Sequence, residues 1–140
     1  MKPVQLIVFI IWGALCGSLG LYAVMLSSMT FAPGHGGPQS LGQIIALAAG
    51  SSAALSFFLR KLLLGGFSSG VLSLEDPVNR GRFVAGNVVV FALSEGVAVL
   101  GFVNGTLSNG RGDSWLPYIG LSLLLMLTHI PLSSRFKPAA

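Results

Sequence analysis

The chain has 140 residues, of which 53% are hydrophobic and only 9% are charged. A soluble globular protein carries about 25% charged residues, so this composition excludes a soluble fold and indicates an integral membrane protein. The formal net charge of +4 comes from a few basic residues near the ends of apolar segments. That distribution is typical of membrane topology signals and excludes a nucleic-acid-binding surface.

A helix needs about 20 apolar residues to cross a bilayer. Three segments meet this requirement, at residues 4–27, 41–59 and 83–106, and a fourth, at residues 116–132, is short but has Trp115 and Tyr118 near its start as interfacial anchors. The first segment is similar to a signal peptide, but its apolar run exceeds the usual 7–15 residues, so we expect it to remain as a span. The sequence therefore predicts an all-α membrane protein, with residues 1–140 forming one integral membrane domain of four transmembrane helices.

Lysine and arginine are divided unequally between the two sides of the predicted helices. Because positively charged connections stay in the cytoplasm, the distribution predicts that both termini and the middle connection, residues 65–81, are cytoplasmic. We expect the membrane to be a bacterial inner (plasma) membrane. Only Arg111 falls on the outer side, whereas the inner side carries Lys2, Arg60, Lys61, Arg80, Arg82, Arg135 and Lys137.

The two halves of the chain are faintly alike. Residues 14–21 of the first segment resemble residues 92–99 of the third. A duplication would give two tandem helical hairpins, and parallel repeats of this kind occur in membrane proteins. Chance similarity between apolar, small-residue-rich helices explains the same pattern, so the sequence leaves both interpretations open.

Small residues let membrane helices approach each other closely, and they are concentrated in the first three segments. The fourth segment is bulkier, with four leucines and a methionine at residues 123–127. This pattern predicts a compact set of the first three helices, with the fourth helix on the outside. A monomeric bundle and a homo-oligomer that uses the remaining glycine faces both agree with it.

Glu95 is an acidic residue within the otherwise apolar third segment. At 1.5 Å per residue it lies about 19 Å beyond Arg82, near the middle of a hydrocarbon core about 30 Å thick. A charge at that depth costs at least about 2.5–3.5 kcal/mol, and no cation stands three or four positions away. We therefore expect a neutral acid that exchanges its proton when water or a cation approaches. The alternative is a structural acid that hydrogen-bonds to a neighbouring helix.

Three other polar side chains are candidates for the same site. Gln43 in the second segment is the candidate partner of Glu95, through helix tilt or a water molecule. Asn87 and His129 are candidates for a proton access path, with a helix–helix hydrogen bond and an interfacial histidine as their alternative roles. The sequence contains no nucleotide-binding loop, no nucleophile–base set and no group of metal or haem ligands. Neither enzymatic activity, a cofactor nor a metal site is expected.

Residues 92–102 read Ala-Leu-Ser-Glu-Gly-Val-Ala-Val-Leu-Gly-Phe, which resembles the proton-binding helix of the c subunit (proteolipid) of rotary ATP synthases. Pro77 is similar to the proline in that family's cytoplasmic loop. The resemblance covers the second and third segments and implies that Glu95 binds and releases a proton as an oligomeric ring turns. The chain departs from the family at Glu75 and Asp76, which stand in place of arginine and glutamine, and in its two flanking segments.

These features predict a small membrane protein that handles protons or cations through Glu95, distantly like a c-type proteolipid. Its expected partners are the lipid bilayer and either further copies of itself or other membrane subunits, with no nucleic acid. The alternative function is a non-catalytic accessory or assembly subunit of a larger membrane complex.

Overall fold

A computed structural model describes residues 3–30 and 39–131 of the chain. These residues form four helices, α1 (Pro3–Ser28), α2 (Gln39–Ser68), α3 (Pro77–Leu107) and α4 (Gly112–Thr128). The described part of the chain contains no strand, which confirms the all-α class. Three helices, α1 to α3, are long and apolar enough to cross a membrane. At 17 residues α4 is about 26 Å long, so a fourth full span stays a prediction.

The helix ends differ from the predicted segments because capping, rather than hydropathy, decides where a helix begins and ends. Asp76 caps α3 by accepting a hydrogen bond from the Val78 amide at 2.9 Å, and Pro77 occupies the first turn. The helix therefore starts well before the apolar run. Likewise α2 continues past Lys61 and ends before Gly70, whose positive φ of 81° reverses the chain. Lys2, Arg135 and Lys137 lie outside the described residues.

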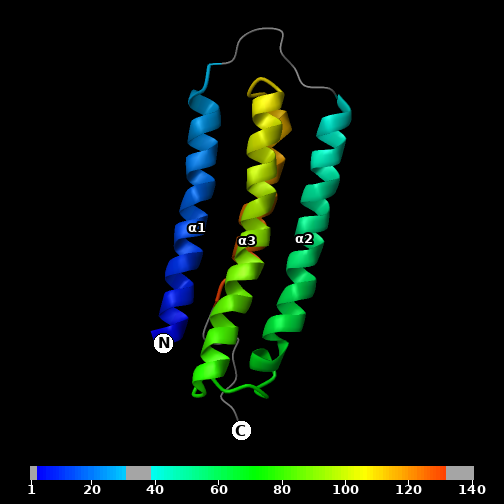
Figure 1. The fold of residues 1–140 in the computed structure, drawn as a ribbon. Helices are drawn as coiled ribbons and strands as arrows, with labels where there is room; N and C mark the ends of the chain where they lie inside the picture. The colour runs from blue at the N-terminus through cyan, green and yellow to red at the C-terminus, as the bar shows by residue number, and fades with distance from the viewer. Residues whose placement is uncertain (1–2, 31–38, 132–140) are drawn as a thin grey trace.

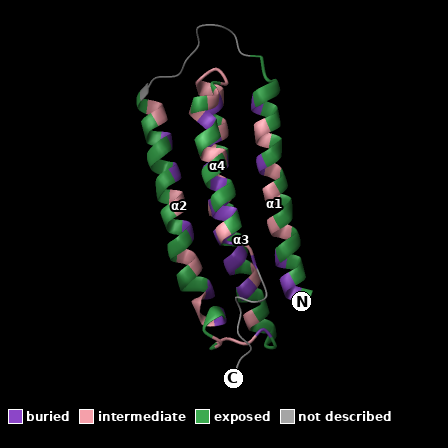
Figure 2. Cartoon of the chain, turned by 180° about the vertical axis from the view of Figure 1, so that it is seen from behind, coloured by how far each residue is buried: buried purple, intermediate pink, exposed green. Residues whose placement is uncertain are grey.

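Helix α3 is the centre of the bundle. It packs most extensively against α2, then against α4 and α1, whereas α1 and α2 make little contact with each other. Figure 1 shows α1 and α2 on either side of α3, and the reverse view in Figure 2 brings α4 in front of α3. The molecule is thus one bundle around α3 rather than two equally packed hairpins.

The small residues allow close packing within the chain in α3 but not in α1, where a contact between copies stays a prediction. Gly86, Gly101 and Gly105 of α3 are buried against side chains of neighbouring helices. In α1, by contrast, Gly13 and Gly17 have open space where a Cβ would lie. Close approach is needed where α3 is enclosed by three helices, whereas α1 contacts the bundle along one side only.

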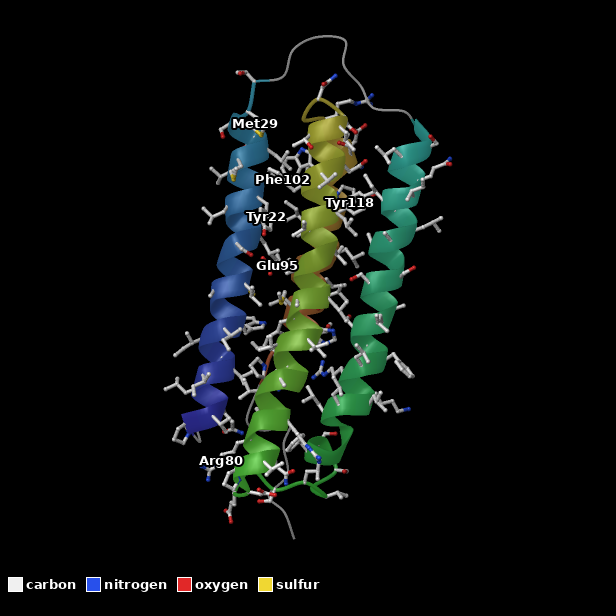
Figure 3. The ribbon with its side chains drawn as sticks, viewed as in Figure 1. Tyr22, Met29, Arg80, Glu95, Phe102 and Tyr118 are labelled. Atoms are coloured by element: carbon white, nitrogen blue, oxygen red, sulfur yellow. The ribbon has the colours of Figure 1, made fainter. Side chains whose placement is uncertain are left out.

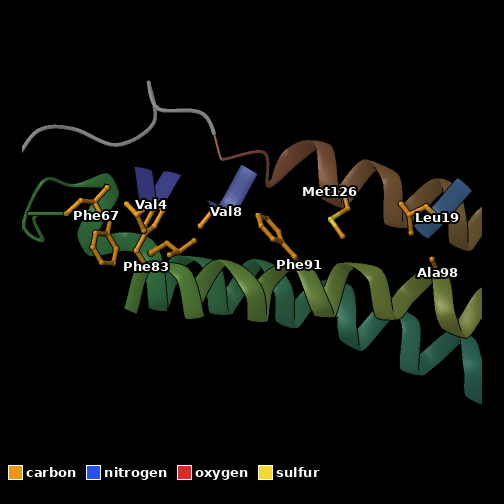
Figure 4. Packing of buried hydrophobic residues seen from close by; sticks show 10 residues of the cluster. Val4, Val8, Leu19, Phe67, Phe83, Phe91, Ala98 and Met126 are labelled. Atoms are coloured by element: carbon orange, nitrogen blue, oxygen red, sulfur yellow. The ribbon is translucent and has the colours of Figure 1, made fainter. Parts of the chain in front are cut away.

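The fourth helix is also less peripheral than predicted, because it packs directly on the central helix. Met126 of α4 is fully buried in the main hydrophobic cluster, together with Val8, Phe83 and Phe91 (Figure 4). The opposite face of α4 carries exposed leucines, as expected for contact with lipid. These leucines are Leu123, Leu124 and Leu127.

Candidate intramembrane carboxyl site

Glu95 lies on the side of α3 that faces α1, close to Tyr22 of that helix (Figure 3). Its Oε1 atom is 2.6 Å from the Ser18 hydroxyl oxygen and 3.1 Å from the Tyr22 hydroxyl oxygen. Ser18 and Tyr22 are four residues apart on α1 and therefore share one face of that helix. Sequence reasoning missed both hydroxyls. The available signal was the spacing of these two hydroxyl residues, which stand four positions apart in an otherwise apolar helix.

The hydrogen count around Ser18 indicates which protonation state suits this geometry. The Ser18 oxygen is 2.6 Å from Glu95 Oε1 and also 2.6 Å from the Leu15 carbonyl oxygen. A hydroxyl has one hydrogen and two acceptor lone pairs, so it cannot donate in both short contacts. If Ser18 donates to Leu15, a protonated Glu95 donates to Ser18 and both contacts are satisfied. The arrangement therefore fits a neutral acid.

The second carboxyl oxygen of Glu95, Oε2, differs from Oε1 in its hydrogen bonding. Glu95 is half-buried, and Oε2 makes no hydrogen bond with the described residues. No described lysine, arginine or histidine forms an ion pair with this carboxyl group. One oxygen is thus held by α1, while the other remains accessible to water or to another group.

The register between α2 and α3 shows where the nearest basic residue lies. Gly86 packs against Leu64, and Gly96 lies beside Ser52, so these antiparallel helices place Arg60 level with Val90. That position is about 7–8 Å from Glu95 along the helix axis. The guanidinium group nevertheless turns towards α4 and away from the carboxyl site, because it donates to the Thr128 carbonyl oxygen. A cation at a helix C-terminus satisfies its last carbonyls and opposes its dipole.

His129 is bound on both ring nitrogens in the same region, and it is only 2% exposed. Arg60 Nη1 lies 2.8 Å from Nδ1, so Nδ1 accepts a hydrogen bond. The other nitrogen, Nε2, then carries the hydrogen and donates to Ser56 Oγ at 3.2 Å. The ring is therefore a buried link between α2 and α4, and its place near the membrane boundary stays a prediction.

Asn87 and His129, the two predicted access residues, line the same cavity of about 290 Å³. The cavity lies at the C-terminal end of α4, between α2 and α3. Asn87 is buried, and its amide donates to the Phe83 carbonyl oxygen at 2.8 Å. Glu95 is not on the wall of the cavity, since it lies about 12 Å beyond Asn87 along α3.

The structure does not bring Gln43 to Glu95. The neighbouring Gly42 lies beside Asn104 of α3, which is about 13–14 Å from the level of Glu95. The side chain of Gln43 is exposed. Helix tilt does not close such a gap, because the α2–α3 register is set by packing along the whole interface.

Comparison of the chain with protein-family models, with curated proteins and with solved structures gives no match. The resemblance of residues 92–102 to the c-subunit helix therefore stays a prediction. The described residues contain no group of three or more His, Cys, Asp or Glu side chains that could hold a metal ion.

The contact between Ser18 and Glu95 should contribute to the stability of the bundle. We expect Ser18→Ala to lower the free energy of unfolding by about 0.6–1.7 kcal/mol, the range of hydrogen bonds between membrane helices. Ser27→Ala is the matched control, because this exposed hydroxyl bonds only to Val24 of its own helix. Unfolding by SDS in mixed micelles measures both variants, and equal stability of the two would contradict the assignment.

Proposed function

We propose that this chain is a small integral membrane protein that takes up and releases protons at Glu95. The observation that supports this proposal is the asymmetric carboxyl group of Glu95. One oxygen is held by the Ser18 and Tyr22 hydroxyls in a geometry suited to a neutral acid. The other has no partner among the described residues. When the proton leaves, the Ser18 hydroxyl can turn its hydrogen from the Leu15 carbonyl oxygen to Oε1, so the contacts with α1 are kept, and water can approach the free oxygen.

The ion that suits this site is a proton rather than a metal cation. A hard cation such as calcium takes 6–8 oxygen ligands. Glu95, Ser18 and Tyr22 supply only two carboxyl oxygens and two hydroxyls. A proton needs one acceptor at a time, and the carboxyl group provides it.

We place both termini and the α2–α3 connection in the cytoplasm, in a bacterial plasma membrane, on the distribution of lysine and arginine. With this orientation the cavity lined by Asn87 and His129 opens towards the cytoplasm. Water in the cavity would shorten the path from the cytoplasm to Glu95. Arg60 and Lys61 on its wall would repel metal cations but not prevent proton transfer through water.

The proposal includes a distant likeness to c-type proteolipids and assembly into a homo-oligomer. Two observations support the likeness. The α2–α3 pair has the most extensive helix contact, as a hairpin of that kind requires, and Glu95 lies on its second helix. The exposed glycine face of α1 offers a surface for close approach between copies.

The test is labelling of the protein in liposomes with a hydrophobic carboxyl-reactive carbodiimide, followed by mass spectrometry of the modified residue. Because the protonated acid reacts, we expect modification at Glu95 that becomes slower as the pH rises. Glu75 is the internal control, since this exposed carboxylate should remain unmodified under the same conditions. Absence of labelling at Glu95 at every pH would remove the basis of the proposal.

A second candidate function is a non-catalytic accessory or assembly subunit of a larger membrane complex. It is favoured by the hydrogen bonds of Glu95 with Ser18 and Tyr22, which join α3 to α1. A neutral acid with a purely structural role would make the same bonds. Stoichiometric co-purification with unrelated membrane subunits after gentle detergent extraction would support this function.

A further inference from the structure

The two hydroxyls that contact Glu95 differ in how they respond to its charge. Ser18 suits both forms of the carboxyl group, because its hydroxyl accepts from the acid and can turn to donate to the carboxylate. The Tyr22 hydroxyl donates to Oε1 at 3.1 Å, which is longer than the usual distance of about 2.7–2.8 Å between hydroxyl donors and oxygen acceptors. Hydrogen bonds to a carboxylate are shorter and about twice as strong as those to a neutral group. The Tyr22 contact therefore gains strength when Glu95 loses its proton.

The position of the Tyr22 hydroxyl is fixed by the helix that carries the acid. The Tyr22 ring packs on Phe102 of α3, with ring centroids 5.7 Å apart and an angle of 48° between the ring planes. Phe102 stands two turns after Glu95, so both side chains lie on the same face of α3. Figure 3 shows Tyr22 at a level between the two. A donor held in this way needs little rearrangement to bind the carboxylate.

Among the described residues, no other ionisable group pairs or hydrogen-bonds with Glu95. The neighbouring helices α2 and α4 present the neutral hydroxyls of Ser52 and Ser122, which donate to carbonyl oxygens of α3. Arg60 donates to α4 instead. The remaining titratable side chains of the bundle have other surroundings: Cys16 packs against the main hydrophobic cluster, Tyr118 lies beside Gly101, and His129 bonds to Arg60.

We propose that Tyr22 is a positioning residue that sets the pH at which Glu95 releases its proton, by donating a hydrogen bond that stabilises the carboxylate more than the acid. This inference rests on the proposed proton exchange at Glu95 and adds to it a determinant on a different helix. Ser18 keeps its contact in both protonation states, whereas Tyr22 favours one of them.

The test is the pH profile of carbodiimide labelling at Glu95, measured on the full-length protein in liposomes. Tyr22→Phe keeps the ring on Phe102 and removes only the hydroxyl. The midpoint is the pH at which the labelling rate falls to half of its low-pH value. We expect Tyr22→Phe to raise it by about one unit, because the carboxylate loses a charge-assisted hydrogen bond. Ser18→Ala should move the midpoint by less, since Ser18 bonds to both forms.

Tyr118→Phe is the matched control. Tyr118 is a half-buried tyrosine of α4 that makes no hydrogen bond with the described residues, so its replacement should leave the midpoint unchanged. Phe102→Leu is a second variant that loosens the Tyr22 ring without removing a polar group, and it should raise the midpoint as well.

An unchanged midpoint in Tyr22→Phe, or an equal shift in Tyr118→Phe, would overturn this proposal and leave proton exchange at Glu95 standing. Should Tyr22→Phe fail to fold, an unchanged midpoint in Phe102→Leu would overturn it in the same way. Absence of labelling at Glu95 at every pH in the wild-type protein would overturn both proposals.

Discussion

Glu95→Gln should abolish proton exchange while the bundle stays folded. The amide has the shape of the neutral acid: with its oxygen at the position of Oε1 it can accept hydrogen bonds from the Ser18 and Tyr22 hydroxyls, but it has no exchangeable acid proton. We expect proton flux in liposomes to fall to the level of protein-free vesicles, measured with an enclosed pH-sensitive dye. The free energy of unfolding should change by less than about 1 kcal/mol, because the hydrogen bonds are replaced rather than lost.

Glu75→Gln is the matched control for this experiment, because it removes a carboxylate from the exposed connection before α3. It should leave both proton flux and stability unchanged. If Glu95→Gln retains full flux, proton handling at Glu95 is wrong and the accessory-subunit function is favoured. If it instead unfolds the protein, the neutral-acid geometry inferred from Ser18 is wrong.

Gly101→Ala should be the most damaging small substitution in the helices. A Cβ at Gly101 would overlap the Cβ of Tyr118 and approach its Cγ to 3.0 Å, with the Trp115 carbonyl oxygen 3.4 Å away. Since a backbone oxygen and the base of a side chain cannot move aside, α3 and α4 must separate. We expect a loss of about 1–3 kcal/mol in the free energy of unfolding, as for other overpacked cores, measured by SDS unfolding.

Gly17→Ala provides the comparison within the same chain, because a Cβ at this position on α1 has nothing within 4 Å. In the monomer it should be neutral or slightly stabilising, since alanine favours helix more than glycine does, whereas in the proposed homo-oligomer it should weaken association, because the α1 glycines would lie at the contact between copies. A tolerated Gly101→Ala together with a damaging Gly17→Ala in the monomer would contradict the packing of α4 and α1 described above. Measurement of both variants in the monomeric and oligomeric fractions therefore also tests the proposed homo-oligomer.

The helical class and the number of helices could be predicted because they depend on local composition. Long apolar runs exclude strands and loops in a bilayer, where every backbone group must be satisfied within its own helix. The ends of the helices were harder to predict from the sequence. Asp76 and Pro77 start α3 ahead of its apolar run, and α2 passes through Arg60 and Lys61 without a break. Hydropathy marks the part of a helix that lies in hydrocarbon, whereas capping marks its physical end.

The sequence by itself determined that Glu95 is the residue to examine, because the free energy of placing an acid in hydrocarbon does not depend on which helix lies beside it. Only the tertiary structure decided its partners. The rotation of α3 turns Glu95 towards Ser18 and Tyr22 of α1. The register between α2 and α3 leaves Gln43 far along α2. The packing of α4 against α2 buries His129 against Arg60. These pairings follow from the close packing of glycines and large side chains between helices, which acts over the whole interface and leaves no local pattern in the chain.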